Sequence, residues 1–141
     1  MKYILDSSVA FKSELSETDS DKADAIRTDF RNAVHELLAP DIFTVEVSHA
    51  FTRAERQGRI AVGEARKLFL DILTTPPKFS SFQPLLLRAI EISSKMRVGV
   101  YDCLYVAMGE QENCEIVTAD KTMVNALQKD FPFIIPLASM P

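Results

Sequence analysis

Four acidic residues of the sequence lie next to apolar segments, where a carboxylate is unusual: Asp6, Glu46, Asp102 and Asp120. Asp6 directly follows the apolar residues 3–5, and Asp120 follows residues 116–118, so each lies just past a predicted strand. Because the carboxyl ends of parallel strands open onto one edge of a sheet, we expect these two carboxylates to converge. Taken alone, either residue could instead be a helix N-cap, a position that favours Asp.

Glu46 and Asp102 belong to predicted helices with apolar faces. Glu46 lies on the edge of a stripe formed by Phe43, Val47, Ala50 and Ala54, and a carboxylate turned toward a core is costly unless a cation or hydrogen bonds compensate it. The alternatives are that Glu46 leans out to solvent or pairs with Arg53. Asp102 heads the apolar residues 103–109, where it is a cap, a ligand or both.

Four carboxylates at one sheet edge would repel each other and raise each other's pKa. A hard divalent cation removes that penalty, and oxygen-only ligands favour Mg²⁺ or Mn²⁺ over zinc. The sequence offers no Ser–His or Cys–His pair that could act as an activated nucleophile. The chemistry indicated is therefore metal-assisted hydrolysis.

The hydrophobic pattern predicts strands that alternate with helices along a single domain, residues 1–141. Strands are expected at residues 3–5, 78–82, 116–118 and 133–135, and helices at 22–38, 41–57 with Asp41 as cap, 63–73, 85–96, 101–112 and 121–129. The acidic residues 14–24 indicate an exposed loop or a helix start. This alternation predicts an α/β fold whose mostly parallel central sheet is covered on both faces.

The composition is that of an acidic globular protein, with a net charge of −4. Binding of nucleic acid by bulk electrostatics normally requires a basic protein, so bound cations, a locally basic surface or a basic partner would have to reverse the repulsion. Cys103 and Cys114 are expected to be reduced thiols, and His35 and His49 do not form a recognisable zinc site. No apolar run could span a bilayer and the N-terminus lacks a signal-peptide core, so a cytoplasmic location without membrane contact is expected.

The four acids, in their order and approximate spacing, resemble the PIN domain, and more narrowly the VapC toxins of toxin–antitoxin pairs. The resemblance extends over nearly the whole chain, from Tyr-Ile-Leu-Asp6-Ser-Ser8 through Glu46 and Tyr101-Asp102 to Val-Thr118-Ala-Asp120. It implies a three-layer α/β/α fold and an endoribonuclease that hydrolyses RNA phosphodiester bonds with Mg²⁺ or Mn²⁺.

The resemblance also implies roles for residues and partners. Asp6, Asp102 and Asp120 would be metal ligands, directly or through water, with Glu46 beside them as a fourth catalytic acid. Ser8 and Thr118 would orient water or metal, unless they are ordinary cap and turn hydroxyls. Apart from the resemblance, the basic residues that could contact RNA are Lys121, Lys12, Arg53, Arg56, Arg59 and Arg97, and Lys121 is favoured because it is next to Asp120. The expected partners are an RNA substrate, a small antitoxin protein and a second copy of the chain in a homodimer.

Other protein classes share part of this sequence pattern. A haloacid-dehalogenase-type phosphatase needs a second Asp where this chain has Ser8, and a receiver domain needs paired acids near the N-terminus. Glu46 and His49 have the spacing of a di-iron ligand pair, but no second copy of that pair exists. Another Mg²⁺-dependent phosphohydrolase, or a catalytically silent PIN-fold binding module, is the alternative function.

Overall fold

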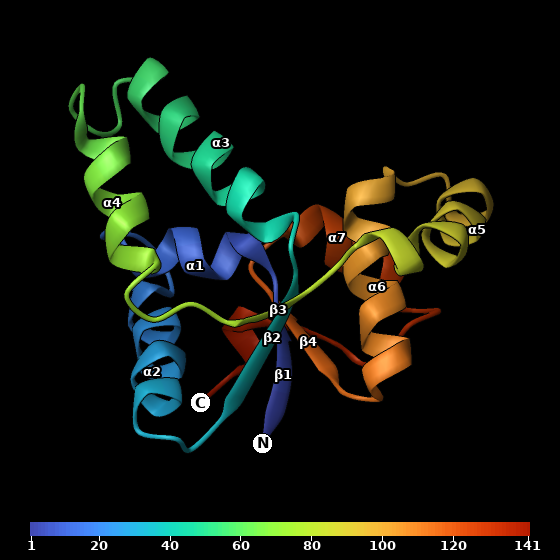
Figure 1. The fold of residues 1–141 in the computed structure, drawn as a ribbon. Coiled ribbons are helices and arrows are strands. Elements are labelled where there is room, and N and C mark those ends of the chain that lie inside the picture. Colours follow the sequence, from blue (N-terminus) through green and yellow to red (C-terminus); the bar gives the residue numbers. More distant parts are fainter.

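Five parallel strands form the centre of the protein in the computed structural model, which describes residues 1–141 (Figure 1). The strands are β1 (Lys2–Leu5), β2 (Glu36–Pro40), β3 (Lys78–Ser80), β4 (Glu115–Thr118) and β5 (Ile134–Pro136), in the order β3-β2-β1-β4-β5. The chain builds the sheet outward from β1 in one direction and then, from β4, in the other. The strand order therefore reverses between β1 and β4.

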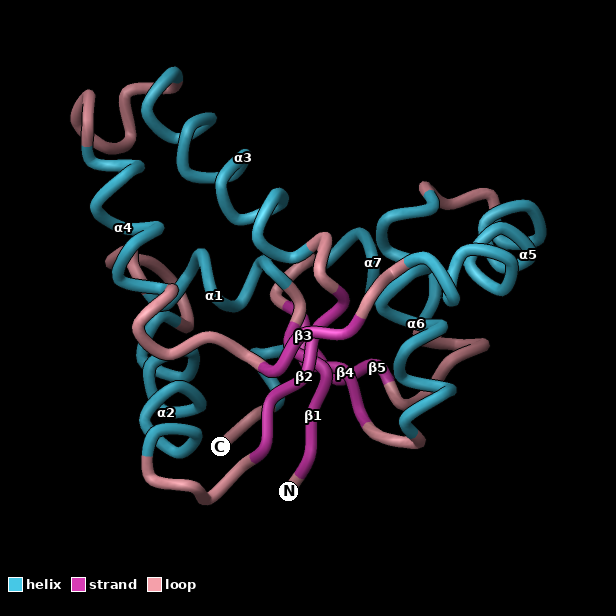
Figure 2. Tube along the Cα trace, in the orientation of Figure 1, coloured by secondary structure: helices cyan, strands magenta, loops and turns pink.

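Helices cover both faces of this sheet, which confirms the three-layer α/β/α fold. They are α1 (Ser7–Ser13), α2 (Ser20–Arg31), α3 (Phe43–Arg56), α4 (Glu64–Ile72), α5 (Leu86–Met96), α6 (Val100–Glu112) and α7 (Lys121–Leu127). In Figure 1, α1 to α4 lie on the left of the sheet, and α5 and α6 lie on the right. Figure 2 shows that α3 and α4 form a helical hairpin reaching beyond the sheet. None of the helices combines the length and apolarity needed to cross a membrane.

The core is divided between the two faces because successive strand residues point to opposite sides. Tyr3 and Leu5 pack with α1 to α4, whereas Ile4 between them packs with α5, α6 and α7. Both sides of β1 are thus apolar, as in parallel sheets buried on both faces. Such a run stops being apolar only where the strand ends, and that is where Asp6 follows.

The prediction of a helix over residues 22–38 was wrong in its second half. The helix α2 ends at Arg31, Ala33 has a positive φ of 59°, and residues Glu36–Pro40 form β2 beside β1. Asp41 was also expected to cap the next helix, but its Oδ1 instead accepts a 3.0 Å hydrogen bond from the Phe82 N–H. The position before α3 is Ile42, and no side chain caps that helix.

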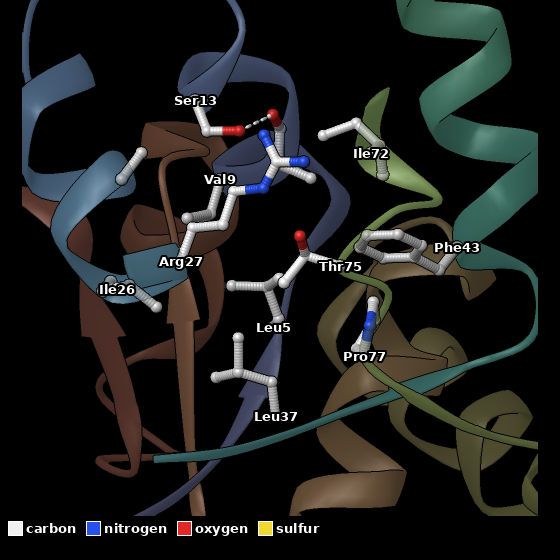
Figure 3. A pocket seen from close by; sticks show the side chains of 12 residues that line it. Leu5, Val9, Ser13, Ile26, Arg27, Leu37, Phe43, Ile72, Thr75 and Pro77 are labelled. Carbon is white, nitrogen blue, oxygen red and sulfur yellow. Dashed lines mark hydrogen bonds between the residues drawn. The ribbon is translucent and has the colours of Figure 1, made fainter. Parts of the chain in front are cut away.

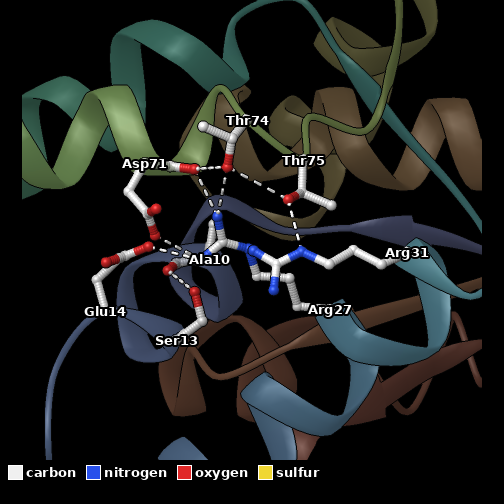
Figure 4. A network of polar contacts seen from close by, with 8 residues as sticks. All are labelled: Ala10, Ser13, Glu14, Arg27, Arg31, Asp71, Thr74 and Thr75. Atoms are coloured by element: carbon white, nitrogen blue, oxygen red, sulfur yellow. Dashed lines mark hydrogen bonds and ion pairs between the residues drawn. The ribbon is translucent and has the colours of Figure 1, made fainter.

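An arginine-centred network ties the α1–α4 layer together (Figure 4). Arg27 on α2 donates to Glu14 at the end of α1 and to Asp71 on α4, at 2.7 and 2.9 Å. Arg31 adds a 3.0 Å bond to Thr75. Three segments that are distant in sequence are held together by these contacts.

A small cavity of about 20 Å³ lies under this network, among Leu5, Ile26, Leu37, Phe43 and Ile72 (Figure 3). That volume has room for about one water molecule. The α1–α4 layer is therefore closely packed and has no room for a larger ligand. The larger hollows of the protein lie at the sheet edge.

Candidate functional site

The candidate site lies at the carboxyl edge of the sheet, between β1 and β4, where the strand order reverses. Crevices at this point are the usual ligand sites of open α/β sheets. Asp6 is the first residue after β1, and its N–H donates a 3.0 Å hydrogen bond to the Val117 carbonyl of β4. Asp120 follows β4 by two residues. The sequence-based expectation that the two strand-end acids share one edge agrees with this placement.

Asp6 is a buried carboxylate, only 4% exposed. It stands in front of α1 but makes no cap hydrogen bond to that helix, so the capping alternative does not hold for it. Its Oδ2 accepts hydrogen bonds from the hydroxyls of Ser8 and Thr118, the latter at 2.8 Å. Burial raises the pKa of Asp6, the charge of Asp120 adds to the rise, and the two hydroxyls oppose it.

Ser8 and Thr118 fix the orientation of Asp6. Each hydroxyl donates its one proton to Oδ2 and accepts from a backbone N–H, Ser8 from Ala119 at 2.9 Å and Thr118 from Asp120 at 3.0 Å. Since a hydroxyl has a single proton, both donors are used inside this cluster. The arrangement leaves Asp6 Oδ1 as the oxygen that neither hydroxyl bonds.

Glu46 lies in the first turn of α3 and is held by a residue that the sequence analysis missed. The Tyr105 hydroxyl on α6 donates a 2.6 Å hydrogen bond to Glu46 Oε1. Burial raises the pKa of Glu46 to about 7, the charges of Asp6 and Asp102 contribute, and the Tyr105 bond opposes the rise. Glu46 forms no ion pair with Arg53 and is not turned away from the cluster, so neither alternative for it holds.

Tyr105 itself is fully buried, and burial together with the charges of Asp6 and Glu46 raises its pKa. It stands three residues after Asp102, on the same side of α6. Within so apolar a helix a tyrosine is normally a core residue. The spacing from Asp102 is the one sequence signal that could have singled it out.

Asp102 lies in the first turn of α6 and is not the cap of that helix, whose N-cap is Gly99. It receives no hydrogen bond from a protein side chain. Burial raises its pKa to about 7, with further contributions from the charges of Asp6 and Asp120. Asp102 is thus the acid of the cluster that the protein compensates least.

Asp120 is the one acid of the four that does cap a helix. Its Oδ1 accepts from the N–H groups of Thr122 and Met123 at 2.9 and 3.3 Å. This cap uses one carboxylate oxygen, so the cap and a second role on the other oxygen are compatible. The capping alternative holds for Asp120 without excluding a role in the cluster.

None of the four acids forms an ion pair with a lysine, arginine or histidine. The charges of Asp6 and Asp102 help to raise the pKa of Glu46, and those of Asp6 and Asp120 help to raise the pKa of Asp102, so these carboxylates lie within electrostatic reach of one another. No three acidic, histidine or cysteine side chains are close enough together to hold a metal ion by themselves. The donor set nevertheless fits Mg²⁺, which binds through one or two carboxylates and keeps several water molecules.

Two hollows flank the cluster. A groove of about 630 Å³ lies on the α3 side and includes Ser8, Glu46 and Asp120. A second hollow of about 460 Å³ lies beside Thr118 and is lined by both Lys12 and Lys121. Lys121 is exposed and forms no ion pair, whereas Lys12 pairs with Glu17 at 3.2 Å. His49 is exposed on α3, and Cys103 and Cys114 are free thiols, as expected.

Comparison with known structures agrees with this architecture. A crystal structure of PAE2754 from Pyrobaculum aerophilum matches with a TM-score of 0.72 and 17% identity, over 99% of this chain and 85% of the other. The structure of VapBC2 from Rickettsia felis, bound to a DNA fragment from their promoter, matches with a TM-score of 0.63 and 16% identity, over 96% and 97% of the two chains. At these identities the likeness concerns the fold.

Among curated proteins, none matches the sequence. The sequence profile of the PIN domain, by contrast, matches residues 3–126, a span that contains Asp6, Glu46, Asp102 and Asp120. PIN domains are generally nucleases. The chain, with its central parallel sheet and its acids at the switch point, belongs to the PIN domain family.

Proposed function

We propose that this chain is an endoribonuclease that depends on Mg²⁺ or Mn²⁺ and hydrolyses RNA phosphodiester bonds. One observation carries the proposal: four carboxylates gather at the switch point of the sheet and no protein cation neutralises any of them. Uncompensated buried charge is expensive, so an ion from solution is the simplest source of compensation.

Asp6, Asp102 and Asp120 are the residues that would hold the ion, in part through water. Asp6 offers Oδ1, Asp102 is free of side-chain donors, and Asp120 offers the oxygen that does not cap α7. When bound, the ion supplies positive charge for the phosphate and activates a water molecule. Oxygen-only donors are the choice of a hard divalent cation.

Glu46 is positioned to accept a proton. Its Oε1 is held by Tyr105, which turns the carboxylate and leaves the second oxygen to take a proton from the attacking water. The water oxygen forms a bond to phosphorus while the bond from phosphorus to the leaving ribose oxygen breaks, and solvent supplies the proton of that leaving oxygen. Ser8 and Thr118 act one step removed, because they hold Asp6 in place.

Lys121 and Lys12 would bind the RNA backbone on the α7 side of the cluster. Both line the same hollow next to Thr118, although they are far apart in sequence. Lysine is a flexible point charge suited to a phosphate contact. These two side chains would provide a locally basic surface, which an acidic chain needs if it is to bind RNA.

We further infer that the chain is the toxin of a type II toxin–antitoxin pair, inhibited by a small antitoxin, homodimeric and cytoplasmic. Two findings support this inference: the chain belongs to the PIN family, and its fold is similar to that of a chain in the structure of VapBC2 from Rickettsia felis. The pairing requires a neighbouring gene for a small DNA-binding protein that co-purifies with this chain, and the absence of such a gene would refute it.

The activity test compares the wild type with Asp6→Asn and with a matched control, Asp24→Asn, an exposed position on α2. With Mn²⁺, we expect the wild type and the control to cut single-stranded RNA, and Asp6→Asn to lose cleavage while remaining folded. Excess chelator should stop the wild type. RNA left intact by the wild type, or cut equally by all three proteins, would refute the proposal.

A further inference from the structure

The groove beside the acids continues along α3. At one end it is lined by Glu46 and Asp120, and it passes His49 and Arg53. A smaller hollow of about 280 Å³ shares Phe11, His49, Ala50 and Arg53 with it and extends to Gln57 and Arg59. The two hollows are therefore one continuous path leading away from the acidic cluster.

The path follows one face of α3, because its residues recur at helical spacing. Glu46, His49, Arg53 and Gln57 are three or four positions apart, and such residues lie one above the other on a helix. From Glu46 to Arg53 the helix rises by about 10 Å. A group at Arg53 would thus lie beyond a phosphate bound at the acids, although in the same groove.

The sign of the charge changes along this path. The acidic end needs a cation, whereas Arg53 at the other end is exposed and has no ion pair and no side-chain hydrogen bond. Arg59, further along, is already engaged: it bonds Glu17 at 2.6 Å and stands over the Phe11 ring at 5.4 Å from its centroid. Arg53 is consequently the free cation of the groove.

An exposed aromatic ring completes the lining. Tyr101, next to the candidate ligand Asp102, is 57% exposed and borders the same groove. An exposed tyrosine and a free arginine in one groove are the combination by which proteins hold single-stranded nucleic acid. The ring is a platform for a base, and the positive charge binds the backbone.

We propose that the α3 groove is a metal-independent subsite for the RNA nucleotides next to the bond that is cut. Arg53 binds a backbone phosphate and Tyr101 stacks on a base. This proposal rests on the proposed function, because it takes the acids as the place of cleavage. The strand would run from the Lys12–Lys121 hollow past the acids to α3, with protein cations on both sides of the cut.

The composition of the groove favours RNA over a peptide as its occupant. An internal phosphodiester carries RNA backbone on both sides of the bond that is cut. Each flank of the cluster offers an unpaired cation for that backbone, Lys121 on one side and Arg53 on the other. A free cation and a free ring at a site of phosphodiester cleavage are complementary to a nucleotide.

The test compares Arg53→Ala with Arg56→Ala. Arg56 is on the same helix, is exposed and unpaired, but does not line the groove, so each variant removes one positive charge. With Mn²⁺ and a labelled single-stranded RNA, we expect Arg53→Ala to raise KM about tenfold, more than it lowers kcat, and Arg56→Ala to behave as the wild type.

Binding of the same RNA in the presence of chelator gives a second readout. The slope of log affinity against log salt should fall by about 0.7 in Arg53→Ala, as for the loss of one phosphate contact on a single strand. Tyr101→Ala should weaken binding, and Tyr101→Phe, which keeps the ring, should restore it.

The outcomes separate this inference from the proposed function. If the wild type does not cut RNA, the proposed function fails. If the wild type cuts RNA but Arg53→Ala and Arg56→Ala share its KM and salt slope, only the subsite is refuted. Loss of binding to a small antitoxin in Arg53→Ala, with RNA affinity unchanged, would make the groove a protein surface and would also overturn the proposal.

Discussion

The Tyr105 hydroxyl on α6 donates a 2.6 Å hydrogen bond to Glu46 Oε1 on α3, and so joins helices from opposite faces of the sheet across the acidic edge. The bond links two groups that are both costly to bury alone. Because it fixes Glu46 from the side of α6, it also fixes how the Glu46 carboxylate faces Asp6 and Asp102.

Removal of that hydroxyl should impair catalysis more than stability. Tyr105→Phe keeps the buried ring and deletes one hydrogen bond, so we expect a loss of about 1 kcal/mol in the free energy of unfolding. Because Glu46 is no longer held, kcat for RNA should fall while KM changes little. Urea unfolding and steady-state kinetics measure both. A variant with wild-type kcat would show that the bond only supports packing.

Asp102 should destabilise the metal-free protein. Asp102→Asn removes a mostly buried charge that lies near other acids, and we expect the free energy of unfolding at about pH 8 to rise by about 1 to 2 kcal/mol, after allowance for solvent screening. The same variant should lose RNA cleavage. Denaturant unfolding with chelator provides the measurement, and destabilisation by Asp102→Asn would contradict the clustering of charge.

The stability of the metal-free protein should fall as pH rises. Burial raises the pKa of Glu46 and of Asp102 to about 7, from 4.5 and 3.8. The folded state therefore holds these protons more tightly than the unfolded state, and the stability they contribute is complete below the ordinary pKa values and lost as pH rises to about 7.

Thermal melts between about pH 4 and pH 8 test this pH dependence. Glu14 also has its pKa raised to about 7, mainly by burial, so the informative quantity is a difference between proteins. The double variant Glu46→Gln, Asp102→Asn should show a flatter profile than the wild type. Parallel profiles would mean that these two acids titrate normally.

Divalent ions should stabilise the wild type by mass action. At a hundredfold excess over its dissociation constant, an ion that binds only the folded state adds about 2.7 kcal/mol. We expect Mg²⁺ or Mn²⁺ to raise the melting temperature of the wild type by several degrees, and to raise that of Asp6→Asn less. An equal rise in both proteins would place the ion elsewhere.

The arginine network should matter for stability and not for chemistry. Arg27→Ala leaves Glu14 buried without its partner, at a cost of about 2 to 4 kcal/mol in the free energy of unfolding. The control Arg31→Ala removes one exposed hydrogen bond and should cost less than about 1 kcal/mol. If both variants lose the same free energy of unfolding, the Glu14–Arg27 ion pair contributes no more to stability than an exposed hydrogen bond.

The sequence was informative where one pattern dominated. The apolar run before Asp6 and the run before Asp120 predicted two strands correctly, and the rule for strand ends then predicted one shared edge. Residues 36–38 were misassigned to a helix because Leu37 continues the helical stripe of Ile26 and Phe30. The sharp end of α2, with Ala33 in a left-handed conformation, is a tertiary effect that periodicity does not encode.

The sequence predicted where the site lies, but it did not predict how the side chains of the site are arranged. Whether an acid caps a helix depends on side-chain rotation, and Asp120 caps while Asp6 and Asp102 do not. The Glu46–Tyr105 bond joins residues 59 positions apart, so only the packing of α6 against the rest of the protein reveals it. The same holds for the groove that both Arg53 and Tyr101 line.

The rate of RNA cleavage as a function of Mn²⁺ concentration tests the central claim most directly. For the wild type we predict no cleavage in chelator and a saturable rise with Mn²⁺, and for Asp102→Asn a folded protein whose rate stays near zero at every concentration. Cleavage by the wild type that is independent of Mn²⁺, or an Asp102→Asn curve that overlays the wild type, would contradict the account.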